Sequence, residues 1–420
     1  MLRSVFLAVV LVFGLVGNVC AEGFNLNEWS ARGFGLAGGL VGRADDASAL
    51  AYNAAGITQL PGTHLMIGGA IATPYGSINN TETGESQHNV VNTWSIPHFY
   101  ATHQLNDNWW IGLGLFTRFG LGNGFPTNWF GRYSITAVGM ESLSAVPTVA
   151  YKINDMFSVS LGLEVTYLSM YLSRQVPQFG IVPGVGPGYI GDNHMQIDGE
   201  SWAIGGHLGL HARLSDQWSV GFAYKTQTVH HFHGKARFDR QYVSPIPLGF
   251  QRQVDSPVES VERLPDSFAL GICYKPLENL SFEVGATWTR WSTYNHLNIY
   301  FDGWANYSSI ADKNWQDAWN FNVSVEYKPT DWLALRAGYW HETPVVSAEY
   351  ADYIVPSNGR HMLTLGAGFY WDNWTVDLAY GHEWVNKLSF NTSIDRPSVK
   401  HGYIDDLQAD IFMLSIGYSF

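Results

Sequence analysis

The chain is short of charged residues and cysteines, and of long apolar runs beyond its N-terminal end. Only 14% of its 420 residues are charged, whereas ordinary soluble domains have about 25%. Of its two cysteines, Cys20 lies in the N-terminal apolar segment, which leaves Cys273 alone and excludes a disulfide-stapled fold. The lack of further apolar runs argues against membrane-spanning helices.

Basic residues are also scarce, with 23 Lys and Arg against 36 Asp and Glu and a formal net charge of −13. This balance disfavours nucleic-acid binding, which needs a basic surface. Aromatic residues are abundant at 15%, and there are 44 glycines. A chain rich in aromatics and glycine but poor in charge is typical of a membrane β-barrel, where lipid-facing apolar residues alternate with polar residues that face the lumen.

The N-terminal end has the layout of a secretory signal. Arg3 supplies a positive start, an apolar run follows from Leu7 to Val16, and small residues end at Ala21. The run is shorter than the roughly 18–20 residues of a spanning helix. We therefore expect residues 1–21 to be a removed signal peptide and the protein to be exported. The repeated strands described next indicate the outer membrane of a Gram-negative bacterium as its destination.

One unit recurs six times after this leader: a tight turn with Asp or Asn, an aromatic residue or Leu, and then an alternating strand. The turns start at Asn106, Asn154, Ser215, Leu277, Thr330 and Trp371. They follow predicted strands at 92–105, 141–153, 200–213, 265–275, 317–328 and 360–370. Six hairpins, with "HLMIGGAIATPYG" in front and "ADIFMLSIGYSF" at the end, predict fourteen strands. An even number fits a closed antiparallel barrel, and a soluble β-sandwich is the alternative.

Side chains in these strands alternate with period two, so each strand has one apolar and one polar face. Between 157 and 167 the odd positions are apolar, and the even positions are Ser158, Ser160, Gly162, Glu164 and Thr166. Charges are costly in lipid, so we expect the inner face to hold Glu164, Glu283, Glu326, Arg336 and Asp377. Interfacial girdles are expected from the tryptophans at strand ends, which are Trp109, Trp110, Trp218, Trp332, Trp340 and Trp371.

The connections alternate between tight turns and long loops, as in outer-membrane barrels with short periplasmic turns and long external loops. The predicted long loops are 76–91, 120–140, 173–199, 231–264, 293–316, 343–359 and 387–408. Loop 173–199 is rich in Pro and Gly and is apolar for an exposed segment. Such a surface predicts a binding groove, although packing of loop on loop is an equal alternative.

Residues 22–62 fit no strand and are rich in Gly and Ala, with short helical pieces expected at 44–52. Gly33, Gly35 and Gly38 match the G-x-G-x-x-G fingerprint of dinucleotide-binding turns. That fingerprint needs a strand before it and a βαβ unit around it, and neither is present. A fourteen-stranded barrel is wide enough to need filling. We therefore expect 22–62 to pack in the lumen as a plug, ahead of a barrel at 63–420.

The stretches "FNLNEWSARGFGLAGG" and "ADDASALAYNAAGIT" carry a resemblance to a known family, supported by "LPDS", "WTRWS" and "VPSNGRHMLTLGAG". The chain resembles the FadL-type outer-membrane transporters of long-chain fatty acids and hydrocarbons, with Ala54 where the family has Pro. The resemblance implies fourteen strands and a plug. Its implied plug residues are Asn27, Glu28, Ser30, Gly33, Gly35, Asp45, Asp46, Asn53 and Ala55.

The resemblance also implies a mechanism: external loops capture a hydrophobic compound, the plug rearranges, and the compound leaves sideways by passive diffusion through a kinked third strand. The implied kink is at Phe119, Gly120 and Leu121, in a strand weakened by several glycines. Capture is expected at loops 173–199 and 231–264. The candidate substrate contacts are Arg174, Val176, Phe179, Ile181 and Val182. Arg174 and Arg336 are candidates for a carboxylate contact, with lumen ion pairing as the alternative for both.

Several other functions are less well supported. A lipase would need a Ser, His and acid set that no spacing singles out. A general or specific porin for small polar solutes remains the alternative, against which the plug segment argues. The group "HHFH" (His230, His231, His233) lacks further ligand spacing, so neither metal nor cofactor is expected. Expected partners are outer-membrane lipid, lipopolysaccharide and the barrel-assembly machinery, with the protein itself a monomer.

Overall fold

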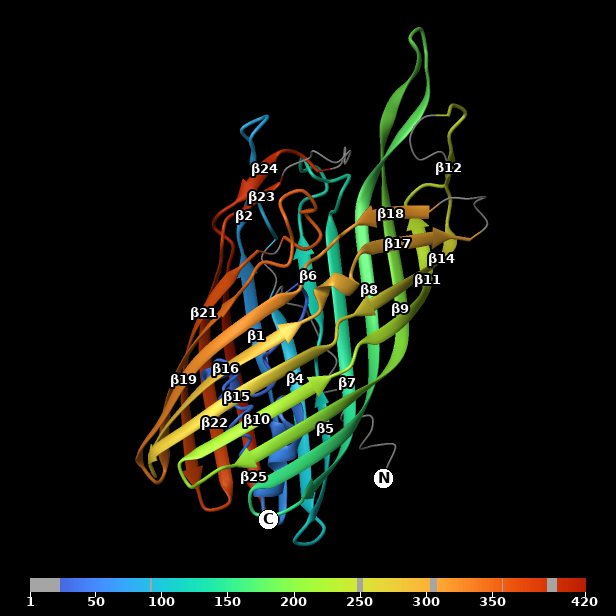
Figure 1. Cartoon of the computed structure of the whole chain (residues 1–420). Helices are drawn as coiled ribbons and strands as arrows, with labels where there is room; N and C mark the ends of the chain where they lie inside the picture. Colours follow the sequence, from blue (N-terminus) through green and yellow to red (C-terminus); the bar gives the residue numbers. More distant parts are fainter. Residues whose placement is uncertain (1–22, 91–92, 248–251, 303–307, 357, 391–398) are drawn as a thin grey trace.

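The computed structural model describes residues 23–90, 93–247, 252–302, 308–356, 358–390 and 399–420 (Figure 1). The predicted signal peptide lies outside the described residues. The chain forms a tilted antiparallel barrel, in which fourteen strands of the described residues close a ring. In chain order they are β1 Thr63–Tyr75, β4 Trp94–Gln104, β5 Trp109–Phe116, β7 Ala137–Lys152, β8 Phe157–Val182, β9 Gly186–Arg213, β10 Trp218–Lys225, β15 Ser267–Leu277, β16 Leu280–Thr289, β19 Ala318–Thr330, β20 Leu333–Glu342, β21 Arg360–Trp371, β22 Trp374–Val385 and β25 Gln408–Ser419.

The ring closes because β1 pairs with the last strand on one side and with β4 on the other. Ile67, for example, lies opposite Ile416 of β25 and opposite Phe99 of β4. The predicted count of fourteen strands is therefore confirmed. Further strands extend the external side: β6 Gly120–Gly124, β11 Thr228–Phe238, β14 Ser256–Leu264, β17 His296–Phe301 and β18 Ser308–Asp312 join the main sheet, and β2 Ser77–Asn80, β3 Ser86–His88, β12 Tyr242–Val243, β13 Arg252–Gln253, β23 Leu388–Phe390 and β24 Gly402–Ile404 form two small sheets.

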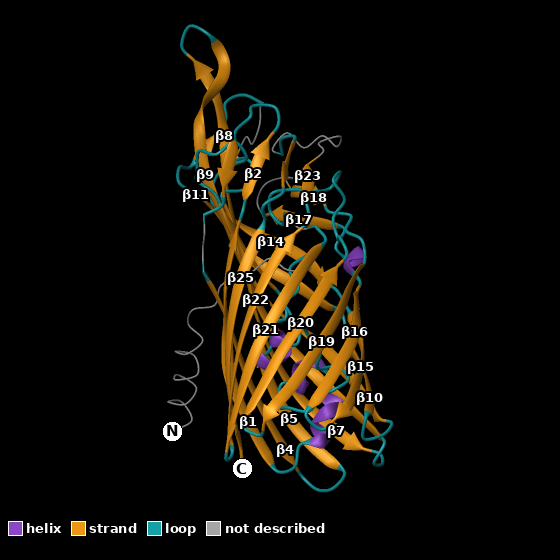
Figure 2. Ribbon diagram, turned by 90° about the vertical axis from the view of Figure 1, so that its left-hand side faces the viewer, coloured by secondary structure: helices purple, strands orange, loops and turns teal. Residues whose placement is uncertain are grey.

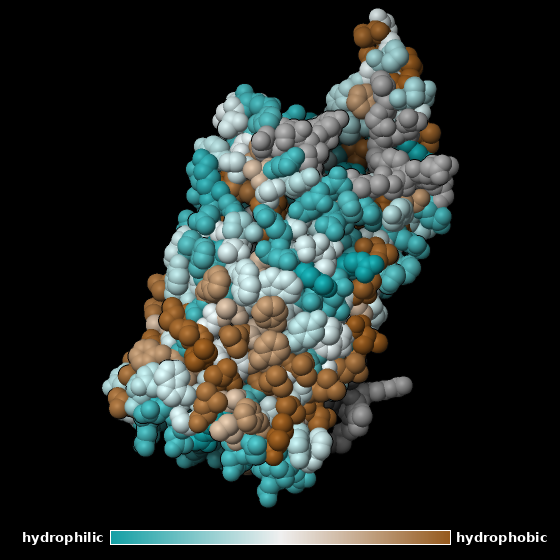
Figure 3. All heavy atoms as spheres, viewed as in Figure 1, coloured by the Kyte–Doolittle hydropathy of each residue, from teal (hydrophilic) through white to brown (hydrophobic). Residues whose placement is uncertain are grey.

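The predicted faces of the strands are confirmed. Leu161 is 68% exposed on the outside of β8, whereas the adjacent Ser160 is 4% exposed and faces the lumen. The acidic and basic residues expected on the inner face are all buried, namely Glu164, Glu283, Glu326, Arg336 and Asp377. Apolar side chains gather on the lower part of the barrel surface and polar ones around the upper part (Figure 3). The lower part is therefore the region suited to lipid.

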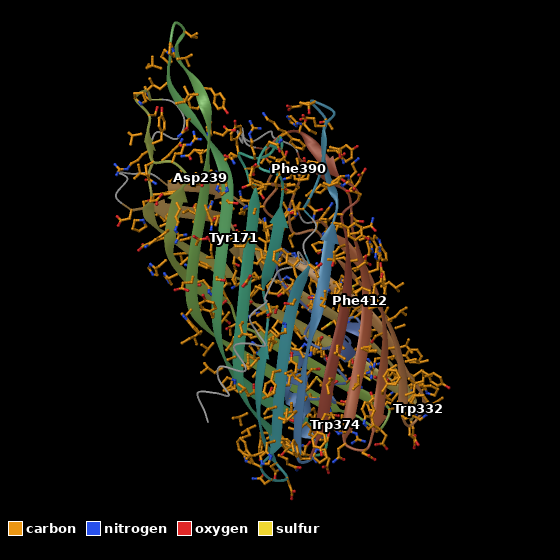
Figure 4. The ribbon with its side chains drawn as sticks, turned by 180° about the vertical axis from the view of Figure 1, so that it is seen from behind. Tyr171, Asp239, Trp332, Trp374, Phe390 and Phe412 are labelled. Carbon is orange, nitrogen blue, oxygen red and sulfur yellow. The ribbon has the colours of Figure 1, made fainter. Side chains whose placement is uncertain are left out.

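The tryptophan girdle is confirmed only in part. Trp332 and Trp374 lie at the lower rim (Figure 4), and Trp109, Trp218 and Trp371 are exposed near strand ends. The prediction is wrong for Trp110 and Trp340, which are buried in the lumen. Trp110 donates its Nε1 hydrogen to the carbonyl of Leu60 at 2.8 Å, so it serves the plug instead of the membrane interface.

The expectation of an irregular loop at 173–199 is wrong. The strands β8 and β9 continue through it and form a long hairpin that projects beyond the other external segments (Figures 1 and 2). The ladder between the two strands begins with Phe157 opposite Ala212 and ends with Val182 opposite Gly186. The predicted loop 231–264 likewise contains β11 and β14, which pair with each other. Pro and Gly are tolerated here because the hairpin stands outside the closed wall.

The plug segment lies inside the lower half of the barrel, where its helices are visible within the ring of strands (Figure 2). It contains α2 Ala31–Gly35, α3 Ala49–Tyr52 and the 3-10 helix η1 Ala54–Gln59. Ser30 begins α2 by accepting a hydrogen bond from the Gly33 amide at 3.1 Å. Gly35 packs closely on the wall, because a Cβ there would lie 3.2 Å from the Gly366 Cα and the wall would have to shift slightly.

Candidate functional site: a plugged lumen beside an interrupted wall

A group of buried charges joins the plug to the barrel wall. Arg32 of α2 donates two hydrogen bonds to the Glu326 carboxylate, each 3.0 Å, in a bidentate pair. Its third nitrogen lies 2.8 Å from an Asp45 oxygen and 3.1 Å from an Asp46 oxygen. Glu326 also accepts a 2.7 Å hydrogen bond from Arg336. Arg32 is thus held by carboxylates of both the plug and the wall.

A second attachment uses the plug backbone. The amides of Val41, Gly42 and Arg43 all donate to the Glu283 carboxylate of β16, at 2.9, 2.8 and 2.8 Å. Gly42 approaches the wall so closely that a Cβ there would lie 2.8 Å from the Gly271 carbonyl oxygen. Three parallel donors give a carboxylate strong and directional binding.

The two aspartates of the plug have different tasks. Asp46 accepts hydrogen bonds from the amide and the hydroxyl of Ser48, which fixes the turn before α3. Asp45 lies between Arg32 and Lys275 of β15, whose nitrogen is 3.3 Å away. Burial alone would raise the pKa of Asp45, but these cations hold it well below its ordinary value.

The remaining implied plug residues are also buried or structural. Asn53 donates from its side-chain amide to the carbonyls of Val41 and of Leu210 in the wall, at 2.9 and 3.0 Å. Its side-chain oxygen accepts from the Ala55 amide. Ala54 is the first residue of η1, a position that suits Pro as well as Ala. The departure from the family's Pro therefore leaves the helix intact.

The third strand of the barrel is interrupted. It forms β5 up to Phe116, breaks at Thr117, Arg118 and Phe119, and resumes as β6 at Gly120. Phe116 lies opposite Ser144 of β7, whereas Gly120 lies opposite Glu141. The interrupted strand therefore holds one more residue than β7 across the same interval, as in a bulge.

This extra residue leaves part of the neighbouring strand without a partner on one side. In the described residues β4 pairs with β5 only through Phe99–Gln104, and β6 pairs with β7 alone. Trp94–His98 of β4 therefore pair with β1 on one side, and on the other side they have no partner among the described strands. In the part of the chain that the structure describes, β4 and β6 therefore form no ladder with each other.

The start of the plug segment fills the interruption from inside. The Leu26 amide donates to the Arg118 carbonyl and the Gly120 amide to the Phe24 carbonyl, both at 2.9 Å. Trp29 donates its Nε1 hydrogen to the Thr117 carbonyl at 2.9 Å. The break in the wall and the plug therefore share hydrogen bonds, and a shift of one changes the other.

An apolar cavity of about 40 Å³ lies above the plug. Phe24 lines it from the plug side, and its other walls come from the external halves of several strands, including Leu121, Met140, Leu172, Phe232 and Ile299. Phe24 itself packs edge-on against Trp291 and Tyr294 at 4.7 and 5.4 Å between ring centroids. A cavity of this size holds a few waters, so an acyl chain fits only after the Phe24 cluster moves.

The structure does not gather the predicted capture residues into one pocket. Val176 is buried in the upper apolar core, and Arg174 lies two residues from it on the same side of β8 without lining the cavity. Phe179 contacts the ring of Tyr189, and Ile181 is 60% exposed near the hairpin tip. The hairpin thus presents an apolar tip, formed by Ile181, Val185, Tyr189 and Ile190.

The arginine that sequence reasoning missed is Arg118. It lies 2.8 Å from Glu164 and also donates to the carbonyls of Thr226 and Pro265. Glu164 is therefore paired with Arg118 and His207. Arg336 pairs with Glu326 and Asp377 in the described structure, which matches the ion-pair alternative. The sequence feature that could have identified Arg118 is its charge within the Gly-rich third strand.

Comparison with known proteins decides the family. The sequence profile described as "Outer membrane protein transport protein (OMPP1/FadL/TodX)" matches residues 14–420. The chain belongs to this family. It is consequently an outer-membrane transporter for hydrophobic compounds and not an enzyme.

Curated relatives align along nearly the whole chain. An outer membrane protein of Neisseria meningitidis is 24% identical, covering 94% of this chain and 93% of the relative. A long-chain fatty acid transport protein of Escherichia coli is 20% identical, covering 95% of both. Solved structures agree in fold: a Pseudomonas aeruginosa FadL homologue has a TM-score of 0.81 at 18% identity, covering 94% of this chain and 99% of that one. The Pseudomonas putida toluene transporter TodX has a TM-score of 0.73 at 17% identity, with the same coverage.

Proposed function

We propose that the protein carries hydrophobic compounds, long-chain fatty acids or hydrocarbons, inward by passive diffusion and releases them sideways through the interrupted third strand. In this proposal residues 1–21 are removed on export, 22–62 act as the plug, and 63–420 form a barrel that works as a monomer among lipid and lipopolysaccharide. The apolar tip of the β8–β9 hairpin collects the compound, which then reaches the cavity at Phe24.

The observation that carries the proposal is that the same residues connect the apolar cavity, the plug and the break in the third strand. Phe24 lines the cavity and accepts a backbone hydrogen bond from Gly120 at the break. Leu121, one residue further along β6, lines the same cavity. A compound that displaces Phe24 therefore acts directly on the hydrogen bonds that fill the break. Relatives named for fatty acid and for toluene transport support the substrate class.

Restoring the register of the third strand tests the lateral route. Deleting Phe119 removes the one extra residue, keeps Arg118 on the inner face and lets the ladder run from Phe116 to Gly124. We expect this deletion to lower uptake of labelled oleate or toluene at least about tenfold in cells without another such transporter. Phe119→Ala is the matched control, because it removes the side chain and keeps the extra residue.

The same cells also test the alternative function. Wild-type uptake by the Phe119 deletion would refute the lateral route. Rapid permeation of small sugars through the intact protein, with no uptake of oleate or toluene, would refute transport of hydrophobic compounds and support a porin. Heat-modifiable migration of each variant shows that the barrel has formed.

A further inference from the structure

The outer face of the barrel has a hollow of about 560 Å³ over the middle of β21, β22, β25 and β1, called the outer hollow below. Its volume is in the range of small-molecule sites, about 300–1,000 Å³. Two small residues, Ala367 and Gly69, stand in one row across the four strands, with Leu378 and Leu414 between them. Larger side chains form the adjoining row, namely Leu365, Tyr380, Phe412 and Ile71. The outer hollow faces away from the lumen, so a molecule in it contacts the membrane and not the plug.

The register of these four strands places their outward side chains in six rows. The row nearest the short turns consists of Trp371, Trp374, Tyr418 and Leu65. The row nearest the external segments consists of His361, Trp384, Gln408 and Tyr75. The two rows are ten residues apart in each strand, which is about 33 Å along the strand and about 25 Å along the barrel axis at a tilt of about 40°. The apolar band of an outer-membrane barrel is about as tall, so these rows lie at the two membrane interfaces.

The outer hollow lies between a polar row and an apolar row. Its residues occupy the third and fourth rows counted from the external side, and Phe412 of the third row lies well above Trp374 in Figure 4. The fifth row is apolar and consists of Phe369, Val376, Ile416 and Ile67. The second row contains His382 and Asp410. The polar row that adjoins the outer hollow is therefore on its external side.

Asp410 is the charged group next to the outer hollow. Its Oδ1 accepts a hydrogen bond from the Tyr380 hydroxyl at 2.7 Å and lies 3.0 Å from His382 Nδ1. The side chains of Asp410 and His382 are 34% and 33% exposed on the outer face. A carboxylate has about four sites that accept hydrogen bonds, so Asp410 can accept a further one from a molecule outside the wall.

An aromatic ring and a cation follow Asp410 toward the external side. Trp384 is exposed and stacks on His361, with 5.6 Å between ring centroids and 14° between ring planes. Lys387, three residues further along the chain, is also exposed, and its Nζ lies 4.0 Å from the ring centroid of Tyr403. The order from the outer hollow outward is therefore apolar surface, carboxylate, aromatic ring and cation.

We propose that this face of the barrel binds one molecule of lipopolysaccharide. An acyl chain of its lipid A lies in the outer hollow, and a hydroxyl or amide group of the acylated sugar donates a hydrogen bond to Asp410. The sugar lies beside Trp384, and a phosphate on it reaches Lys387. The inference does not depend on the transported compound, because the face lies outside the wall.

The order of the groups favours lipopolysaccharide over a phospholipid. A phospholipid joins its phosphate to its acyl chains through glycerol and has no sugar to place against the carboxylate and the aromatic ring. Among the described outward residues of the two external rows there is neither Lys nor Arg, the side chains that usually hold a phosphate. The cation comes only at Lys387, beyond both rows, where the phosphate of an acylated sugar lies and that of a phospholipid does not.

The test measures lipid binding to the whole protein in micelles by native mass spectrometry. The protein is titrated with a purified lipopolysaccharide of short sugar chain and, separately, with phosphatidylethanolamine and with phosphatidylglycerol. We expect Ala367→Phe to weaken lipopolysaccharide binding at least about tenfold, because the ring takes the place of the acyl chain. Asp410→Asn removes the charged acceptor and should also weaken it at least about tenfold. Lys387→Met should weaken it by about two- to fivefold, because its charge is exposed.

Two variants serve as matched controls. Ala286→Phe adds the same ring on the outer face of β16, between Leu270 and Phe321. Asp216→Asn makes the same change of charge in an exposed turn. Both should bind lipopolysaccharide as the wild type does. Heat-modifiable migration shows that each variant has formed its barrel.

Each other outcome overturns the inference in a recognisable way. Wild-type affinity of Ala367→Phe and Asp410→Asn for lipopolysaccharide shows that this face holds no such molecule. Phospholipids that bind equally well, with the same response to the variants, show that the outer hollow takes any acyl chain. An equal loss in Ala286→Phe shows that added bulk on the outer face is the cause. Failure of lipopolysaccharide binding leaves the proposed transport function standing, because uptake of labelled oleate is a separate measurement.

Discussion

Replacing Arg32 should release the plug from the barrel wall, and the buried thiol of Cys273 can be used to detect this movement. Cys273 is 0% exposed on the inner face of β15, opposite Glu283 of β16. The plug covers it closely, since a Cβ on Gly42 would lie 3.0 Å from the Cys273 nitrogen. Its thiol can react with a maleimide only when this part of the plug has moved.

The magnitude follows from the contacts of Arg32. Arg32→Met removes a bidentate pair with Glu326 and leaves Asp45 and Asp46 with less compensation. Breaking a buried ion pair by removing one partner costs about 3–5 kcal/mol. Every 1.4 kcal/mol changes an equilibrium about tenfold, so the population of the displaced plug should rise by roughly a hundredfold or more. The rate of Cys273 labelling should rise by the same factor.

The assay follows maleimide labelling of the folded protein in micelles over time. Arg32→Lys should fall between wild type and Arg32→Met, because lysine keeps the charge but loses the bidentate geometry. Arg213→Met serves as the control, since Arg213 pairs with Asp216 in an exposed turn. A wild-type labelling rate in Arg32→Met, with normal labelling after unfolding in urea, would refute the view that this charge group holds the plug.

Three further changes test other parts of the structure. Burial raises the pKa of Glu28 above its ordinary value of 4.5. The contribution of the protonated carboxyl to stability is therefore present below pH 4.5 and is lost as the pH rises through the pKa of the folded state. Glu28→Gln should raise the urea midpoint at pH 8 and leave it unchanged at pH 4. Ala54→Pro should stabilise the fold by about 0.4–1 kcal/mol, seen as a higher urea midpoint, because Asn53 before it is already extended; a lower midpoint would show that the Ala54 backbone does not suit Pro. Leu161→Arg should cost about 2–4 kcal/mol on the lipid face and reduce the yield of barrel folded into vesicles, whereas equal yields would place Leu161 outside the membrane.

The sequence predicted the ring of strands well because a closed barrel imposes a local pattern. The period-two alternation of β8 is visible residue by residue, and the tight turns repeat. The projecting hairpin was missed because Pro and Gly at 177–191 indicate a loop when read alone. The pairing of Val176 with Asn193 and its neighbours overrides that local signal.

The site was less predictable because it depends on contacts between distant parts of the chain. Arg32 and Glu326 are 294 positions apart, and Arg118 meets Glu164 only through the register of the wall. The plug was expected to be held by small residues, and Gly35 and Gly42 do pack in this way. Its charges were underestimated, because a carboxylate on an inner face gives no local sign of its partner.

The closure of the ring between β1 and β25 constrains the order in which the molecule can be assembled. The plug precedes β1 in the chain, yet it is tied to wall strands that come much later, through Glu283 and Glu326. Its partners do not exist until most of the barrel has been made, and once β1 meets β25 the wall is complete around it. Residues 23–62 can therefore reach their bonded position only once β16 and β19 are part of the wall. The position of the plug thus depends on strands that come much later in the chain, and not on its own segment alone.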